Sequence, residues 1–221
     1  TKINIVMLHG QENEYAMKDK TEMVSLSLLK NKGIDYLALG HVHTYKEAAL
    51  DGRGVYCYPG CLEGRGFDEC GEHGFVLLDI NEGTGKIQSS FIPFAYRNIY
   101  EIRVDITGLM STPEIEKAVE RAVSEKGHSE LSIIKIILEG QTDIETEIDL
   151  DIIKDRLKDQ FFYVRLKDET SVKIDYDAFE LDQSLKGEFV RIVRADSTLS
   201  DKEKSEIIKK GIGALRGDKI I

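Results

Sequence analysis

The sequence lacks any apolar stretch close to the ~20 residues that a membrane-spanning helix needs, and its first residues lack the basic, apolar, small-residue order of a secretory signal. Cysteine is scarce: Cys57, Cys61 and Cys70 make an odd count that argues against a disulfide framework. We therefore expect a cytoplasmic protein with no membrane association. Its 221 residues, 41% of them hydrophobic, are enough to bury one large core or two small ones.

Positive charge is lacking overall, because the formal net charge is −10. Phosphate binding needs a local excess of lysine and arginine, which disfavours a protein whose whole surface binds nucleic acid. The segment 184–221, however, carries more basic than acidic residues. We interpret this basic tail either as a surface for DNA or an acidic partner, or as the solvated face of a helix.

The first part of the chain has the pattern of an α/β layered domain. Residues 3–8 form an apolar run that predicts a buried strand, a helical stripe follows over residues 20–30, and residues 36–39 predict a second apolar strand. This order is typical of a βαβ unit. Shorter strands are then expected, in antiparallel arrangement, at 55–58, 75–80 and 87–92.

A domain boundary is expected near residues 96–99, where a strand with alternating apolar and charged residues begins. The pattern beyond it predicts a β-α-β-α-β module and a last helix at 201–215, with Ser200 as its cap. That helix has an apolar edge that could pack on its own domain or dock on a partner: Ile207, Ile208, Ile212 and Leu215. Gly211 and Gly213 weaken the helix.

Three histidines directly follow the first two predicted strands. His9 ends the first, and His41 and His43 come after Gly40 at the end of the second. Ligands collect beyond the carboxyl ends of strands in open α/β sheets, and imidazole suits Zn, Mn or Fe. A lone histidine at a strand end is usually a hydrogen-bonded turn residue, but a buried His-x-His pair without a metal or other partners is costly.

A competing metal site would use Cys57, Cys61, Cys70 and His73, whose spacing loosely resembles that of a structural zinc site. The spacing lacks a tight zinc knuckle, so we interpret the cysteines as small buried or half-exposed thiols. Arg65 is a candidate for contacting a substrate phosphate, with a surface ion pair as the alternative.

Several motifs together resemble a known family. Gly40-His41-Val42-His43, the upstream His9 and the turn Tyr58-Pro59-Gly60-Cys61 resemble the calcineurin-like metallophosphoesterases, most closely the SbcD-type DNA-repair exonucleases. The stretch 74–80 also resembles that subgroup in order and spacing. The resemblance covers residues 3–97.

The resemblance implies an α/β fold: the C-terminal half of a metallophosphoesterase β-sandwich flanked by helices (residues 1–97), then a small α+β capping domain (residues 98–221). It implies two divalent ions, expected to be Mn²⁺, with His9 and His41 as ligands of one ion and His43 as a ligand of the other. The family's D-x-H, G-D-x-x-D and G-N-H-[DE] motifs are missing here. We expect them, and the catalytic residues, upstream of Thr1.

The implied function is that of part of a two-metal DNA exonuclease or endonuclease, inactive as this piece alone. The implied partners are DNA and an SMC-like ATPase of the SbcC type, and a homodimer is compatible with the resemblance. The alternatives are a phosphodiesterase of the same fold that acts on nucleotides or small phosphoesters, and a non-catalytic interaction module.

Overall fold

The computed structural model describes residues 2–12, 23–144 and 146–217. The chain divides into two compact units. Unit 1 comprises Thr1–Tyr100 with Leu131–Ile133, and unit 2 comprises Glu101–Glu130 with Ile134–Ile221. Both contain strands and helices, so the expected α/β class is confirmed at this coarse level. Across the described ranges, every helix is too short or too polar to cross a bilayer.

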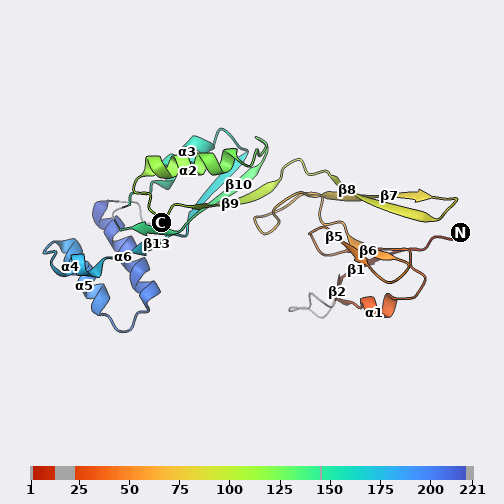
Figure 1. Ribbon diagram of the computed structural model, residues 1–221, viewed down its shortest axis with the longest axis horizontal. Coiled ribbons are helices and arrows are strands. Elements are labelled where there is room, and N and C mark those ends of the chain that lie inside the picture. The colour runs from red at the N-terminus through yellow and green to blue at the C-terminus, as the bar shows by residue number, and fades with distance from the viewer. Residues whose placement is uncertain (1, 13–22, 145, 218–221) are drawn as a thin grey trace. The chain divides into compact units, whose positions relative to one another are not determined.

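Unit 1 is built around a small, mostly parallel sheet (Figure 1). Its described elements are β1 (Ile5–His9), β2 (Gln11–Glu12), β3 (Met23–Val24), α1 (Leu26–Leu29), β4 (Tyr36–Gly40), β5 (Lys46–Ala49), β6 (Val55–Tyr58), β7 (Gly74–Asn81) and β8 (Lys86–Pro93). The sheet has the order β1-β4-β6-β5; β4 runs parallel to both β1 and β6, and β5 is antiparallel to β6. β7 and β8 pair as an antiparallel hairpin. The core beside the sheet includes Leu37, Leu39 and Tyr58.

Two of the sequence predictions for unit 1 need correction. β1 was expected to be buried, yet Ile5, Met7 and Leu8 are 43%, 80% and 40% exposed, because β4 is its single strand neighbour among the described residues. The helix expected at 20–30 is described only over Leu26–Leu29, and Met23 lies in a strand. Residues 20–22 lie outside the described part of the chain. The strands expected at 36–39, 55–58, 75–80 and 87–92 are confirmed. The expected antiparallel arrangement holds for the β7–β8 hairpin, whereas β6 is antiparallel to β5 but parallel to β4.

Unit 2 combines a three-stranded sheet with helices (Figure 1). Its elements are β9 (Ile99–Asp105), α2 (Thr112–Ser124), β10 (Ile133–Glu139), β11 (Gln141–Asp143), α3 (Leu150–Leu157), β12 (Tyr163–Asp168), β13 (Ser171–Lys173), α4 (Tyr176–Glu180), α5 (Leu185–Ala195) and α6 (Asp201–Arg216). The sheet order is β12-β10-β9, and β11 pairs with β13. The predicted β-α-β-α-β order is confirmed, whereas β11, β13, α4 and α5 were not predicted.

The last helix, α6, packs on its own unit. Ser200 caps it, because its hydroxyl accepts from the backbone N–H of Glu203. Ile208 and Ile212 are buried in a core with residues of α4 and α5. These two residues of the apolar edge therefore pack on their own domain, which was the first of the two interpretations. Part of the basic tail is engaged within the unit: Lys204 donates to the Arg194 carbonyl, and Lys209 donates to Asp168. Lys219 lies outside the described residues.

Candidate functional site

The first feature of the site is the alignment of two parallel strands. Residues 5–9 of β1 pair in order with residues 36–40 of β4, so that His9 faces Gly40 across the sheet. His41 follows β4 directly. The imidazoles of His9 and His41 lie edge to face, with ring centroids 5.4 Å apart. Two of the three predicted metal ligands are therefore neighbours at the carboxyl edge of the sheet, where ligands collect in α/β folds.

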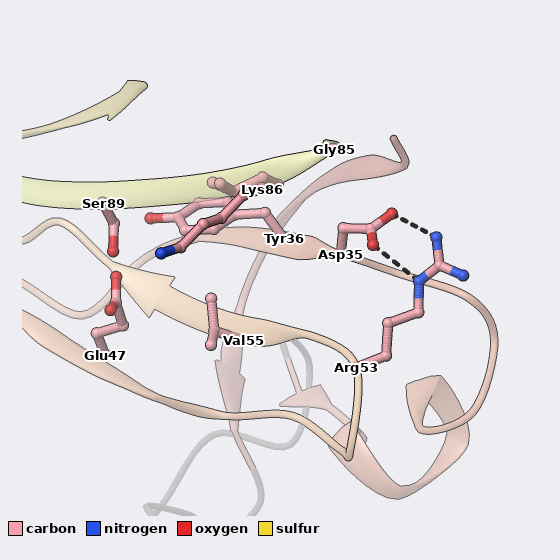
Figure 2. A pocket seen from close by; sticks show the side chains of 9 residues that line it. Asp35, Tyr36, Glu47, Arg53, Val55, Gly85, Lys86 and Ser89 are labelled. Carbon is pink, nitrogen blue, oxygen red and sulfur yellow. Dashed lines mark hydrogen bonds and ion pairs between the residues drawn. The ribbon is translucent and has the colours of Figure 1, made fainter. Parts of the chain in front are cut away.

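A polar network at the opposite end of these strands holds that register. The backbone N–H of Asn4 donates to the Asp35 carboxylate, and Asp35 N–H donates to the Asn4 carbonyl. Arg53 donates to both carboxylate oxygens of Asp35 at 2.8 and 2.9 Å (Figure 2). The hydrogen bond from Arg53 is the main reason that the pKa of Asp35 is lowered. The sequence pattern that predicts the apolar strands gives no indication of these hydrogen bonds among Asn4, Asp35 and Arg53.

The backbone is adapted to the histidines at the carboxyl edge. A Cβ on residue 40 would lie 2.7 Å from Nδ1 of His9, so that glycine lets the imidazole lie against the strand. His41 has a φ of 103°, a value that side-chain-bearing residues rarely adopt. Such strain costs free energy and is found most often at functional sites. The position of His41 is therefore imposed by the surrounding fold.

Tyr58 holds the segment that follows His9 in place by hydrogen bonds. Its ring is completely buried, and its hydroxyl donates to the Gly10 carbonyl at 2.9 Å and accepts from the Glu12 N–H at 3.0 Å. Glu12 is itself completely buried: one carboxylate oxygen accepts from Lys46, and the other, Oε2, has no partner in the described structure. The bond to Glu12 raises the pKa of Lys46. Sequence reasoning missed Glu12, because a single acid after a strand has no distinctive pattern.

His43 points to a different set of residues from His9 and His41. Its Nδ1 lies 2.6 Å from Oε1 of Glu69, while Oε2 of Glu69 accepts from the Arg65 N–H at 2.8 Å. The hydrogen bond with His43 is the largest cause that lowers the pKa of Glu69 to about 2. The guanidinium of Arg65 lies 3.0 and 3.2 Å from the two ring nitrogens of His43. Glu69, 26 residues away in sequence, was not predicted to take part.

Cys61 completes this second group. Its Sγ lies 3.8 Å from Oε2 of Glu69 and 3.3 Å from Nδ1 of His73. Burial, and then the nearby charge of Glu69, raise the pKa of the Cys61 thiol. Of the competing cysteine site, the structure brings together only Cys61 and His73: Cys57 is buried in β6, and the Cys70 thiol donates to the Phe67 carbonyl. None of the three cysteines is in a disulfide.

The described residues offer one closed set of ligand atoms. Donor atoms of His43, Cys61 and Glu69 all lie within 4.8 Å of one another, and this is the one such group of three or more found in the described ranges. His9 and His41 are not part of that group. The geometry thus supports two half-sites, an imidazole pair and a mixed nitrogen, sulfur and oxygen group.

A separate pocket lies at the amino end of β4, away from the histidines. It has a volume of about 350 Å³ and lies between the sheet and the β7–β8 hairpin (Figure 2). Glu47 and Tyr36 line it from the sheet, and Lys86 and Ser89 line it from the hairpin. Burial is the largest cause that raises the pKa of Tyr36. The pocket does not include any predicted site residue.

Comparison with known proteins adds no relative: no family model matches the chain, and no curated protein matches its sequence.

Proposed function

We propose that this chain supplies the histidine half of a two-metal phosphodiesterase that hydrolyses DNA, with His9 and His41 as ligands of one ion and His43 as a ligand of the other. When bound, two ions about 3.5–4 Å apart would activate a water molecule and stabilise the departing oxygen of the phosphodiester. The observation that carries the proposal is the pairing of the His9 and His41 rings, 5.4 Å apart, at the carboxyl edge of two parallel strands.

The residues fit a divalent ion because imidazole nitrogen is a ligand for Mn, Zn and Fe, and because the fold tolerates a strained backbone at His41 to place its ring beside His9. Mn²⁺ prefers oxygen ligands, so a pair of imidazoles alone makes a weak site for it. The proposal therefore includes carboxylate ligands from a segment that precedes these residues in a longer protein.

The outer edge of β1 supports that part of the proposal. Strands of parallel sheets are normally covered on both faces, but Ile5, Met7 and Leu8 of β1 are exposed. An exposed apolar edge strand favours pairing with another strand. A preceding βα segment that pairs with β1 would cover these side chains and would bring its own ligands to the edge where His9 and His41 lie.

Arg65 and unit 2 would position the substrate. The side chain of Arg65 is 71% exposed beside His43, where its guanidinium could bind a phosphate of DNA. Unit 2 would act as a capping domain, and phosphate contacts from its exposed basic residues would orient DNA without reading sequence. An SMC-like ATPase of the SbcC type is the proposed partner.

The proposal is tested first by calorimetric titration of the 221-residue chain with Mn²⁺. Weak binding is expected, and it should be lost when His9 and His41 are both replaced by alanine. His128→Ala, in unit 2, is the matched control and should bind as the original chain does. Binding that survives the double substitution would place the ion elsewhere and overturn the ligand assignment.

Activity is the second test. The chain alone should leave double-stranded DNA and an aryl phosphodiester intact, whereas the longer protein with the D-x-H, G-D-x-x-D and G-N-H motifs should cut DNA with Mn²⁺. Turnover by the chain alone that is lost in His43→Ala would disprove the half-site argument. Cleavage of small diesters only would favour the alternative substrate class, and an inert longer protein would favour an interaction module.

A further inference from the structure

We propose that His43, Cys61 and Glu69, backed by His73, form a second cation site that selects Zn²⁺ over Mn²⁺, and that an ion bound there withdraws His43 from the two-metal site. The second half of this inference rests on the proposed function. The first half, the presence of a zinc-selective site, stands on the geometry of the cluster alone.

The donor atoms of His43, Cys61 and Glu69 are close enough to meet around one ion, because all three lie within 4.8 Å of one another. Bond lengths of 2.0–2.3 Å to zinc place neighbouring ligand atoms roughly 3.3–3.8 Å apart. Sγ of Cys61 lies 3.8 Å from Oε2 of Glu69, and Nδ1 of His43 lies 2.6 Å from Oε1 of the same carboxylate. Small side-chain rotations would bring the three donors around one ion.

The backbone around these donors is held by hydrogen bonds, which lowers the cost of assembling the site. The Cys61 N–H donates to the His43 carbonyl at 3.2 Å, and the Arg65 N–H donates to the Glu69 carboxylate. Gly60, with a φ of 82°, lets the turn approach closely: a Cβ there would lie 2.8 Å from the His43 carbonyl oxygen. The main chains of His43 and Cys61 are therefore joined, and the Glu69 carboxylate is tied to the backbone of Arg65.

The type of ligand selects the ion. A thiolate binds soft and borderline ions such as Zn²⁺, whereas Mn²⁺ favours carboxylate, carbonyl and water. A zinc ion would displace the proton of the Cys61 thiol, since the metal ligand is the thiolate.

His73 is placed to assist this step. Its Nε2 lies 2.9 Å from the Glu69 carbonyl, which can only accept, so Nε2 carries the hydrogen. The lone pair of Nδ1 then faces Sγ of Cys61 at 3.3 Å. His73 can therefore orient the Cys61 thiol as a hydrogen-bond acceptor, and its Nδ1 is placed to serve as a fourth ligand.

The cluster already holds one positive charge, the guanidinium of Arg65. Its NH2 group lies within 3.2 Å of both His43 ring nitrogens and 3.5 Å from Oε1 of Glu69. Because the Arg65 side chain is mostly exposed, it can turn into solvent at little cost when an ion binds. Arg65 and a zinc ion therefore compete for the same ligands.

The site is tested by titrating the 221-residue chain with Co²⁺, whose bond to a thiolate gives a charge-transfer absorption band, and then displacing Co²⁺ with Zn²⁺. We expect the band in the original chain and in Cys70→Ser, the matched control. Cys61→Ser should lose it, with zinc affinity reduced at least about tenfold. A band that persists in Cys61→Ser, or its absence from the original chain, would overturn the site.

Three further variants test the geometry. His43→Ala and Glu69→Gln should each weaken zinc binding, while circular dichroism checks that both fold. Arg65→Gln should bind Zn²⁺ more tightly because the competing charge is gone. Unchanged affinity in His43→Ala together with weaker binding in Arg65→Gln would contradict the assignment of the ligands.

Competition with the two-metal site is measured separately, so that the two proposals can fail independently. One equivalent of Zn²⁺ should remove the part of Mn²⁺ binding that depends on His43, as His43→Ala does, in the original chain but not in Cys61→Ser. A cobalt band with Mn²⁺ binding unaffected by zinc would refute the sharing of His43 and leave the zinc site standing. Loss of the band with Mn²⁺ binding intact would refute the zinc site and leave the proposed function standing.

Discussion

Nδ1 of His9 lies so close to Gly40 that a Cβ on residue 40 would stand 2.7 Å from it. The two residues are register partners in adjacent parallel strands, so the packing of the ring on the glycine is set by the sheet itself. The backbone of Gly40 is not in the left-handed region, and alanine would fit its conformation. The contact therefore offers a way to move His9 without replacing it.

Gly40→Ala should turn the His9 ring away from His41 and leave the fold intact, because an imidazole rotates more easily than a strand moves. We expect the loss of Mn²⁺ binding to match that of His9→Ala, as measured by calorimetry. Circular dichroism should be unchanged. Normal Mn²⁺ affinity in Gly40→Ala would show that the position of His9 is unimportant for the ion.

The strained backbone of His41 predicts a difference between two substitutions. Both His41→Ala and His41→Gly remove the imidazole, but only glycine adopts a φ of 103° without steric cost. His41→Gly should therefore be more stable than His41→Ala by about 1 kcal/mol in denaturant unfolding. Equal stability of the two variants would mean that the backbone at residue 41 is relaxed.

Removing the hydroxyl of Tyr58 should lower the stability of the chain far more than removing the hydroxyl of an ordinary surface tyrosine. Tyr58→Phe leaves the Gly10 carbonyl and the Glu12 N–H buried without their partner. We expect a loss of about 2–3 kcal/mol, and faster hydrogen exchange in β2. Tyr163→Phe, at an exposed position in β12, should change stability by less than about 0.5 kcal/mol.

The Asp35–Arg53 pair predicts a dependence of unit 1 stability on pH. The pKa of Asp35 in the folded chain is lowered from its ordinary value of 3.8, first by Arg53 and then by the Asn4 N–H. The stabilisation is therefore present above pH 3.8 and is lost as the pH falls through the lower folded-state value. Asp35→Asn should be less stable than the original chain at neutral pH.

The difference between the original chain and Asp35→Asn should shrink as the pH is lowered below that range, in urea unfolding followed at several pH values. Arg53→Gln should show the same convergence, since it removes the main cause of the shift. A difference that stays constant down to acid pH would assign the effect to packing and not to charge.

The close packing around Gly211 leads to a prediction about the stability of unit 2. A Cβ at this position in α6 would lie 2.2 Å from Cζ of Phe189 in α5. Gly211→Ala should destabilise unit 2 by about 1–3 kcal/mol through overpacking, which exceeds the gain of about 1 kcal/mol in helix propensity. Phe189→Leu should restore part of the loss, and metal binding by unit 1 should not change. Stabilisation by Gly211→Ala alone would disprove the contact.

The sequence by itself determined the elements whose signal is local. Apolar runs at 36–39 and 55–58 predict strands, and Ser200 predicts the start of α6, because the tendency to form a strand and the capping of a helix depend on residues close together in the chain. The convergence of His9 and His41 could also be predicted. Both directly follow strands that the βαβ pattern makes parallel neighbours.

Only the tertiary structure decided which side chains meet His43 and how far β1 is covered. Glu69 and Cys61 contact His43 although they are 26 and 18 residues away in sequence, and Tyr58 is hydrogen-bonded to Gly10, 48 residues away. Hydrophobic periodicity in the sequence gives no information about contacts at such separations. The apolar run of β1 predicted a buried strand, because hydrophobic side chains favour packing against other apolar groups. The actual exposure of β1 depends on which other strands and helices lie beside it in the folded chain. The chemical character of each residue can be read from the sequence, but the residues come together in a site only through the long-range contacts of the folded sheet and loops.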